Sequence, residues 1–229
     1  SQINMEGCMA AAIKLGKISF IKQKEIDLLK NEKIKLQTEK GNSAMQPAFL
    51  ADIISRVELV VMQKPVDIPN VLRKINELLI NVTYEHTNAK VSLLKEIKLV
   101  REYIELEQCT REEVIEVNLN ISGNMESESI ASFILLQCIE NAFNKVSVLN
   151  VSNKKIDIKI SVVNKMLEML ISWNKPMDTS TLIEGNNIIL RNLNNRLKLI
   201  YPQSHEIRVL IEIEKIIVSL KIDLKGAII

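Results

Sequence analysis

Helical periodicity dominates the first half of the chain. Residues 13–40 are free of Pro and place apolar side chains three and four apart, which predicts a helix with one apolar stripe. The same spacing predicts helices over 45–62 and 71–82, and the short link between them favours an antiparallel hairpin. The apolar stripes are too wide for the hairpin to cover alone. We therefore expect it to dimerise into a four-helix bundle.

A third amphipathic helix is predicted over 93–108, with Glu96 and Glu102 on its solvent-facing side. Beyond this helix the period of the pattern changes. Apolar and polar residues alternate over 115–121, which indicates a half-buried strand, and Gly123 ends the run.

The remaining pattern alternates between strands and helices. In order, the expected elements are a helix over 130–146, strands over 155–163 and 166–173, a polar loop over 179–187, a helix over 188–201, and strands over 206–212 and 216–224. Asn164 and Lys165 are expected to form a tight hairpin turn. This order predicts an α+β fold: a signalling helix and a dimerising helical hairpin over 1–90, then an α/β sandwich over 91–229 with its helices on one sheet face.

Composition supports a packed core and argues against a nucleic-acid partner. The 229 residues are 47% hydrophobic, which is enough to bury a core, but only 3% aromatic, so the core must be mainly aliphatic. Lys and Arg number 30 against 28 Asp and Glu, a net charge of +2. Most nucleic-acid binders need a more concentrated positive surface.

The cysteines and the hydropathy of the chain bear on its cellular compartment. Cys8, Cys109 and Cys138 have no metal-ligand spacing and cannot all pair, which suits a reducing compartment. No apolar run approaches the roughly 18 residues that a spanning helix needs. Because the chain begins with Ser1 rather than Met, we expect it to be a piece of a longer protein whose membrane part is absent.

Several segments together carry a family resemblance. Residues 190–202 read L-R-N-L-N-N-R-L-K-L-I-Y-P, residues 130–142 read I-A-S-F-I-L-L-Q-C-I-E-N-A, and residues 91–97 and 103–107 read V-S-L-L-K-E-I and Y-I-E-L-E. In their order along the chain, these segments resemble the patterns of LytS/YesM-type sensor histidine kinases. The resemblance implies an ATPase domain of histidine-kinase type with ATP and Mg²⁺ as cofactors. It also implies a homodimer, a response-regulator partner, and a cytoplasmic position below an inner-membrane sensor region.

A further segment decides the functional interpretation. Residues 45–52 read M-Q-P-A-F-L-A-D and resemble the family's I-N-P-H-F-L-F-N, whose His takes the γ-phosphate of ATP. Ala48 stands at the position of that His, and Asp52 replaces the final Asn. A methyl group has no lone pair and cannot form a phosphoramidate. The sequence therefore predicts a degenerate member of the family.

The resemblance implies an ATP site that this chain keeps only in part. It assigns Glu140 and Asn141 to the nucleotide helix, with Asn141 as the Mg²⁺ ligand, and puts Lys145 where the family has His. Asn174 is the remaining partner for the adenine amino group, without the glycine that usually follows. These losses predict weak or absent nucleotide binding.

The glycine-rich lid of the family is also altered. Gly185 is kept, but residues 185–190 read G-N-N-I-I-L, so Asn187 and Ile189 replace two glycines. A β-branched side chain there restricts both the backbone dihedrals and its approach to phosphate. Asn192 and Arg196, which the resemblance places near phosphate, are expected on the surface of the following helix.

Three functional hypotheses follow. The leading one is a sensor pseudokinase that passes a signal by conformation. The alternative is an ATP-binding histidine kinase that is active in its native form, because Ala48 was introduced or because the acceptor is displaced, for example to His86. A third is a purely structural dimerisation domain. The other histidine, His205, is expected in a turn after Pro202 without a catalytic partner.

Overall fold

The computed structural model describes residues 55, 68–82, 89–111, 113–149, 151, 153–175 and 187–227. All of them belong to one compact unit, residues 42–229. The predicted helices over 13–40 and 45–62 lie wholly or almost wholly outside the described residues, as does the loop before residue 187, whereas the predicted helix over 71–82 is confirmed at 68–80. The hairpin that pairs this helix with 45–62 is therefore not tested. The domain boundary near residue 90 and the dimer therefore stay predictions.

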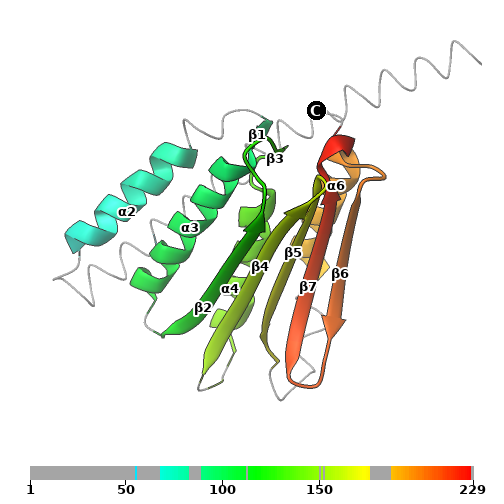
Figure 1. The fold of residues 1–229 in the computed structure, drawn as a ribbon. Coiled ribbons are helices and arrows are strands. Elements are labelled where there is room, and N and C mark those ends of the chain that lie inside the picture. Colours follow the sequence, from blue (N-terminus) through cyan, green and yellow to red (C-terminus); the bar gives the residue numbers. More distant parts are fainter. Residues whose placement is uncertain are drawn as a thin grey trace, which may run out of the picture. The chain divides into compact units, whose positions relative to one another are not determined.

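A five-stranded sheet forms one layer of this unit (Figure 1). Its strands are β2 (Ile115–Gly123), β4 (Lys154–Val163), β5 (Met166–Asn174), β6 (His205–Ile211) and β7 (Lys215–Asp223). Their order across the sheet is β2-β4-β5-β7-β6. The β2–β4 pair is parallel, and the other pairs are antiparallel. The five strands expected from alternating hydrophobicity are all confirmed.

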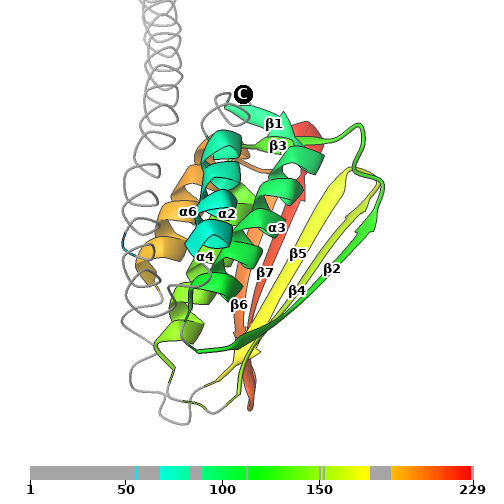
Figure 2. The same cartoon turned by 90° about the vertical axis from the view of Figure 1, so that its left-hand side faces the viewer.

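The helices lie together on one face of the sheet (Figures 1 and 2). They are α2 (Ile68–Ile80), α3 (Leu93–Thr110), α4 (Ile134–Ser147) and α6 (Asn187–Ile200). Helix α4 packs on β4 and β5 and also contacts both α3 and α6, whereas α2 packs against α3. The α+β class is confirmed. No helix in the described part of the chain combines the length and apolar character that crossing a membrane requires.

The core lies between the helices and the sheet. Alternate residues of β4, β5 and β7 are buried because successive strand side chains point to opposite faces. Ile158, Met169 and Leu220 represent the buried row, and all three are fully enclosed. The core is mainly aliphatic, as the low aromatic content predicts.

The β4–β5 hairpin has the expected two-residue turn. Asn164 and Lys165 have φ angles of 52° and 65°. Two successive positive φ values define a type I′ turn, whose twist matches that of the flanking strands.

The prediction of one helix over 130–146 is wrong at its start. Strand β3 (Ser129–Ala131) pairs antiparallel with a short strand, β1 (Lys90–Ser92), and α4 begins only at Ile134. Phe133 lies between the two elements with a φ of 65°, in the left-handed region, which stops helical hydrogen bonding from extending back. Ile130 and Ala131 are buried as strand residues, so their apolar character alone could not distinguish helix from strand.

Candidate functional site

Three of the candidate nucleotide residues lie on α4. Asn141 is buried, with 3% of its surface exposed, whereas Glu140 and Lys145 are half-buried. Asn141 and Lys145 are four residues apart and so share one side of the helix. Burial lowers the pKa of the Lys145 ammonium group. The helix thus presents a buried amide and a partly desolvated cation on the same side.

The side-chain oxygen of Asn141 is the atom that best fits a cofactor. Within the described residues, this buried Oδ1 accepts no hydrogen bond. An amide oxygen is a suitable ligand for a hard cation, so Asn141 would hold Mg²⁺, which would neutralise phosphate charge if ATP binds. Lys145 has the charge needed to contact phosphate. The described residues contain no cluster of His, Cys, Asp and Glu that could hold a metal ion by itself.

Asn174, the candidate adenine partner, is the last residue of β5. Its Oδ1 accepts a 3.1 Å hydrogen bond from the backbone N–H of Lys155. One of the two lone pairs on this oxygen is therefore used to join the start of β4 to the end of β5. A neutral amide oxygen that already accepts a hydrogen bond from the sheet is a weaker acceptor for an adenine amino group than a free carboxylate.

The two candidates on α6 have different environments. Asn192 is exposed, as expected, but the expectation of a surface position for Arg196 is wrong. Arg196 is half-buried, and its Nη2 donates a 2.6 Å hydrogen bond to the carbonyl oxygen of Ser132, before α4. Burial lowers the pKa of Arg196, and the carboxylate of Glu96 opposes this shift. Arg196 lies three residues after the buried Leu193, and so on the same, apolar side of α6.

Three other positions lie outside the described residues: Gly185, Ala48 and His86. His205 was expected in a turn, but it is the first residue of β6. Its Nδ1 lies 2.6 Å from the carbonyl oxygen of Tyr201. Because a carbonyl only accepts, Nδ1 carries the hydrogen in this contact.

A residue that the sequence analysis put on the solvent side is the most enclosed charge in the described structure. Glu96 on α3 has 0% of its surface exposed, so the prediction was wrong. Its Oε2 accepts a 2.9 Å hydrogen bond from the N–H of Phe133, and its Oε1 accepts bonds of 3.0 and 3.3 Å from the N–H groups of Leu135 and Leu136. The carboxylate therefore caps the first turn of α4 from a different helix.

A signal for this burial was present in the sequence. Glu96 lies three residues after Leu93 and four before Val100, and both are fully buried. That spacing puts the carboxylate in the apolar stripe of α3 rather than on its polar side. Glu107, four residues after buried Tyr103, is another buried glutamate of this stripe, at 1% exposed.

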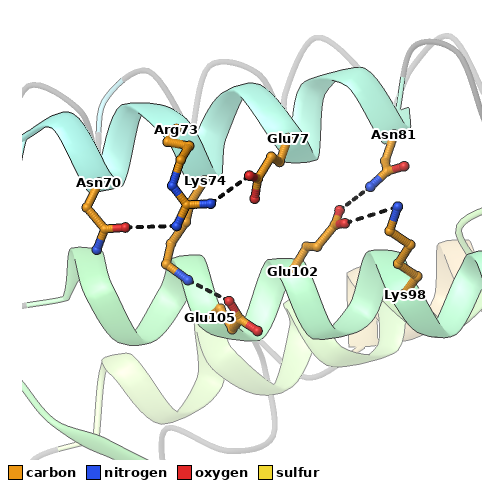
Figure 3. A network of polar contacts seen from close by, with 8 residues as sticks. All are labelled: Asn70, Arg73, Lys74, Glu77, Asn81, Lys98, Glu102 and Glu105. Carbon is orange, nitrogen blue, oxygen red and sulfur yellow. Dashed lines mark hydrogen bonds and ion pairs between the residues drawn. The ribbon is translucent and has the colours of Figure 1, made fainter.

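Polar contacts join α2 to α3 (Figure 3). The Nζ of Lys74 on α2 lies 2.5 Å from the Oε2 of Glu105 on α3. Near the other end of the interface, the Nδ2 of Asn81 donates to Glu102, which also lies 3.8 Å from the ammonium of Lys98. Besides these contacts, α2 buries Val71, Ile75 and Leu78.

Comparison with known protein families matches part of the chain. A family model described as "Histidine kinase" matches residues 36–115. A search of the curated proteins found no match. Among solved structures, the catalytic domain of the histidine kinase ThkA is 15% identical, with 59% of this chain and 94% of that chain covered and a TM-score of 0.42.

Other solved structures have similar values. A histidine kinase domain from Erythrobacter litoralis, of a blue-light activated kinase, is 13% identical over 78% of this chain and 89% of that one, with a TM-score of 0.44. The Acinetobacter baumannii histidine kinase AdeS is 11% identical over 76% and 94%, with a TM-score of 0.42.

The family match covers the acceptor segment, α2 and α3 and includes two of the motifs on which the resemblance rests. Over residues 36–115, the chain is therefore similar to the histidine kinase family.

Proposed function

We propose that this chain is the kinase module of a two-component sensor that transmits its signal by conformation and does not phosphorylate itself. The observation that carries the proposal is Ala48 at the position of the family's phosphoacceptor histidine. Phosphoryl transfer to this position needs a nucleophilic nitrogen, and alanine has none. A family member with this residue keeps the means to change shape but loses the group that stores the phosphate.

The proposed nucleotide contacts support the same conclusion. Asn174 replaces the family's acidic adenine partner, and its Oδ1 already accepts a hydrogen bond from the Lys155 backbone. The sequence over 185–190 retains Gly185 but carries Asn187 and Ile189 in place of two lid glycines. Glycine lets the backbone approach a phosphate closely, and the replacements restrict that approach. We therefore propose that this chain binds ATP weakly or not at all.

The family also suggests partners and a location. We propose that the chain works as a homodimer with a response regulator as its downstream partner. We further propose that it is the cytoplasmic part of an inner-membrane sensor. The family match supports the response-regulator proposal, because sensor kinases act on response regulators. The dimer and the location rest on the resemblance of the sequence motifs. Nearly balanced net charge argues against nucleic acid as an additional partner.

Nucleotide titration in the presence of Mg²⁺ tests the proposal. We expect no saturable binding up to millimolar ATP, and no phosphohistidine by mass spectrometry after incubation with ATP. The variant Ala48→His provides the matched test, because it restores the acceptor and leaves the nucleotide residues unchanged. We expect it to remain unphosphorylated. Micromolar ATP binding, or phosphorylation of this variant, would show that the nucleotide site is functional.

One observation favours a second candidate, an ATP-binding histidine kinase. Asn141 retains the identity of the family's Mg²⁺ ligand, and its buried Oδ1 accepts no hydrogen bond within the described residues. A buried polar atom of this kind is costly unless a ligand satisfies it. This candidate predicts that Asn141→Ala abolishes ATP binding. It also predicts labelled phosphate on His86, which a His86→Ala variant would lose.

A further inference from the structure

The junction between β3 and α4 is held by side chains from two distant helices. Ala131, Ser132 and Phe133 are consecutive, and each offers a backbone group to a different side chain. The N–H of Ala131 donates to the Oη of Tyr201 at 2.9 Å, and the carbonyl of Ser132 accepts from Arg196 at 2.6 Å. Both partners come from α6 or the residue that follows it.

The third side chain comes from α3. Glu96 accepts hydrogen bonds from the N–H of Phe133 and from two N–H groups in the first turn of α4. Phe133, the N-cap residue of α4, makes no side-chain capping bond. The first N–H groups of a helix have no partner inside the helix and carry a partial positive charge. The Glu96 carboxylate, which belongs to α3, accepts these hydrogen bonds and supplies the complementary negative charge.

An electrostatic interaction links Glu96 on α3 to Arg196 on α6. The carboxylate of Glu96 acts on Arg196 and opposes the effect of burial on the guanidinium. The same charge acts on Tyr201 and on Cys138 of α4. In a low-dielectric interior, neutralising one charge leaves the other insufficiently compensated. The positions of α3, the start of α4 and α6 are therefore energetically coupled through Glu96.

We propose that Glu96 is a positioning residue that couples α3 to α6 through the β3–α4 junction. Helix α3 also carries the contacts to α2. A displacement of α3 therefore shifts the start of α4 and changes the contacts of Arg196 on α6. Helix α4 carries Asn141 and Lys145, and α6 begins within the lid sequence at Asn187, so the coupling reaches both parts of the nucleotide region. Its role in signalling rests on the proposed function, whereas the mechanical coupling does not.

Glu107 provides a matched control for Glu96. It lies on the same helix, is equally enclosed at 1% exposed, and forms an ion pair with Arg111 one turn later. Arg111 also lies over the ring of Phe143 in the middle of α4, at 5.7 Å from its centroid, whereas Glu96 contacts the start of α4. The variants Glu96→Gln and Glu107→Gln therefore remove the same charge from similar burial, with different consequences for α4 and α6.

Hydrogen exchange of the full chain, measured by mass spectrometry on these two variants, tests the proposal. In Glu96→Gln we expect exchange about tenfold faster or more at 133–136 and in α6, as the loss of about 1.4 kcal/mol or more predicts. Exchange in β5 and β7 should change by less than about twofold. In Glu107→Gln the effect should stay within the C-terminal turn of α3 and around Phe143, and exchange at 133–136 and in α6 should be unchanged. Uniform acceleration across all elements in Glu96→Gln, or an unchanged α6, would overturn the coupling.

The variant Arg196→Lys keeps the test decisive if Glu96→Gln fails to fold. Lysine retains the charge but loses the planar guanidinium that reaches Ser132. Because coupling between two sites is reciprocal, exchange on α3 around Glu96 should then accelerate together with α6. An effect confined to α6 would contradict the proposal. The readout needs neither ATP nor phosphate transfer, so its failure and that of the proposed function can be told apart.

Discussion

The phenol oxygen of Tyr201 accepts a hydrogen bond of 2.9 Å from the backbone N–H of Ala131, 70 residues earlier in the chain. Both residues are fully buried. The bond ties the end of α6 to β3, next to the carbonyl that Arg196 contacts. Burial raises the pKa of Tyr201, so the phenol stays neutral at physiological pH. The tyrosine of the L-I-Y-P motif thus has a structural role that the motif alone does not reveal.

Removing this hydroxyl should destabilise the unit. In Tyr201→Phe the buried N–H of Ala131 loses its acceptor, and we expect a loss of about 1–3 kcal/mol in the free energy of unfolding. Urea denaturation measures the loss, and amide exchange locates it at Ala131. The control is Tyr103→Phe, which retains the edge-to-face contact of this buried ring with Phe143. If the Ala131 amide exchanges equally fast in both variants, the hydrogen bond to Tyr201 has no role in protecting it.

The contact between Lys74 and Glu105 should set how firmly α2 packs on α3. The Lys74 side chain is 17% exposed and that of Glu105 is 60% exposed, so the pair is partly screened. We expect Lys74→Glu to lower the free energy of unfolding by about 1 kcal/mol, because it places two carboxylates together. Adding Glu105→Lys should restore most of the loss. Denaturant melts of the two single variants and the double variant measure the coupling.

The control for this charge swap is the pair Arg73–Glu77 within α2. Its ion pair is 2.6 Å long, but its side chains are 60% and 49% exposed. Because an exposed pair on one helix contributes little, Arg73→Glu should change stability by less than about 0.5 kcal/mol. An absence of recovery in the double variant Lys74→Glu with Glu105→Lys would mean that the two residues do not interact in solution.

Stability should fall in alkaline solution because of Cys138. Burial first, and the charge of Glu96 second, raise the pKa of this thiol above its ordinary value of 9.0. The folded state keeps the proton where the unfolded chain releases it. The thiol therefore has no effect on stability below pH 9.0, and above it the free energy of unfolding declines by up to about 1.4 kcal/mol per pH unit.

The variant Cys138→Ala isolates this effect. Other ionisable groups are common to both proteins, so the comparison is the change in unfolding free energy between pH 8 and pH 10 in each. We expect the wild type to lose about 1 kcal/mol more than the variant over this interval. Parallel pH dependences in urea titrations would contradict the burial of the thiol.

The β4–β5 turn should accept a stabilising substitution. Lys165 has a φ of 65°, a conformation that favours glycine over residues with a side chain. Asn-Gly is the preferred pair for a type I′ turn, so Lys165→Gly should stabilise the protein by about 0.5–1 kcal/mol. The control is Lys159→Gly in the middle of β4, which should be destabilising. Thermal melts of both variants give the comparison, and a destabilised Lys165→Gly would exclude the type I′ geometry.

Hydrophobic periodicity by itself determined much of this protein. Strands such as β4 and helices such as α3 have a regular apolar side whose period depends only on local backbone geometry. The turn at Asn164 also follows from local chemistry. The absence of a nucleophile at Ala48 is likewise a property of the residue, whatever surrounds it. Such features could be predicted because no distant contact is needed to explain them.

Tertiary structure decided the roles of Glu96 and Arg196. Both are charged, and local propensity assigns charged helix residues to solvent. Their burial depends on partners far along the chain: the start of α4 for Glu96, and the Ser132 carbonyl for Arg196. Helix α4 begins after β3, and its first N–H groups have no partner within the helix, so they need an acceptor from elsewhere in the fold. A buried charge is stable only where the fold brings it complementary groups, and the sequence does not state which groups will meet.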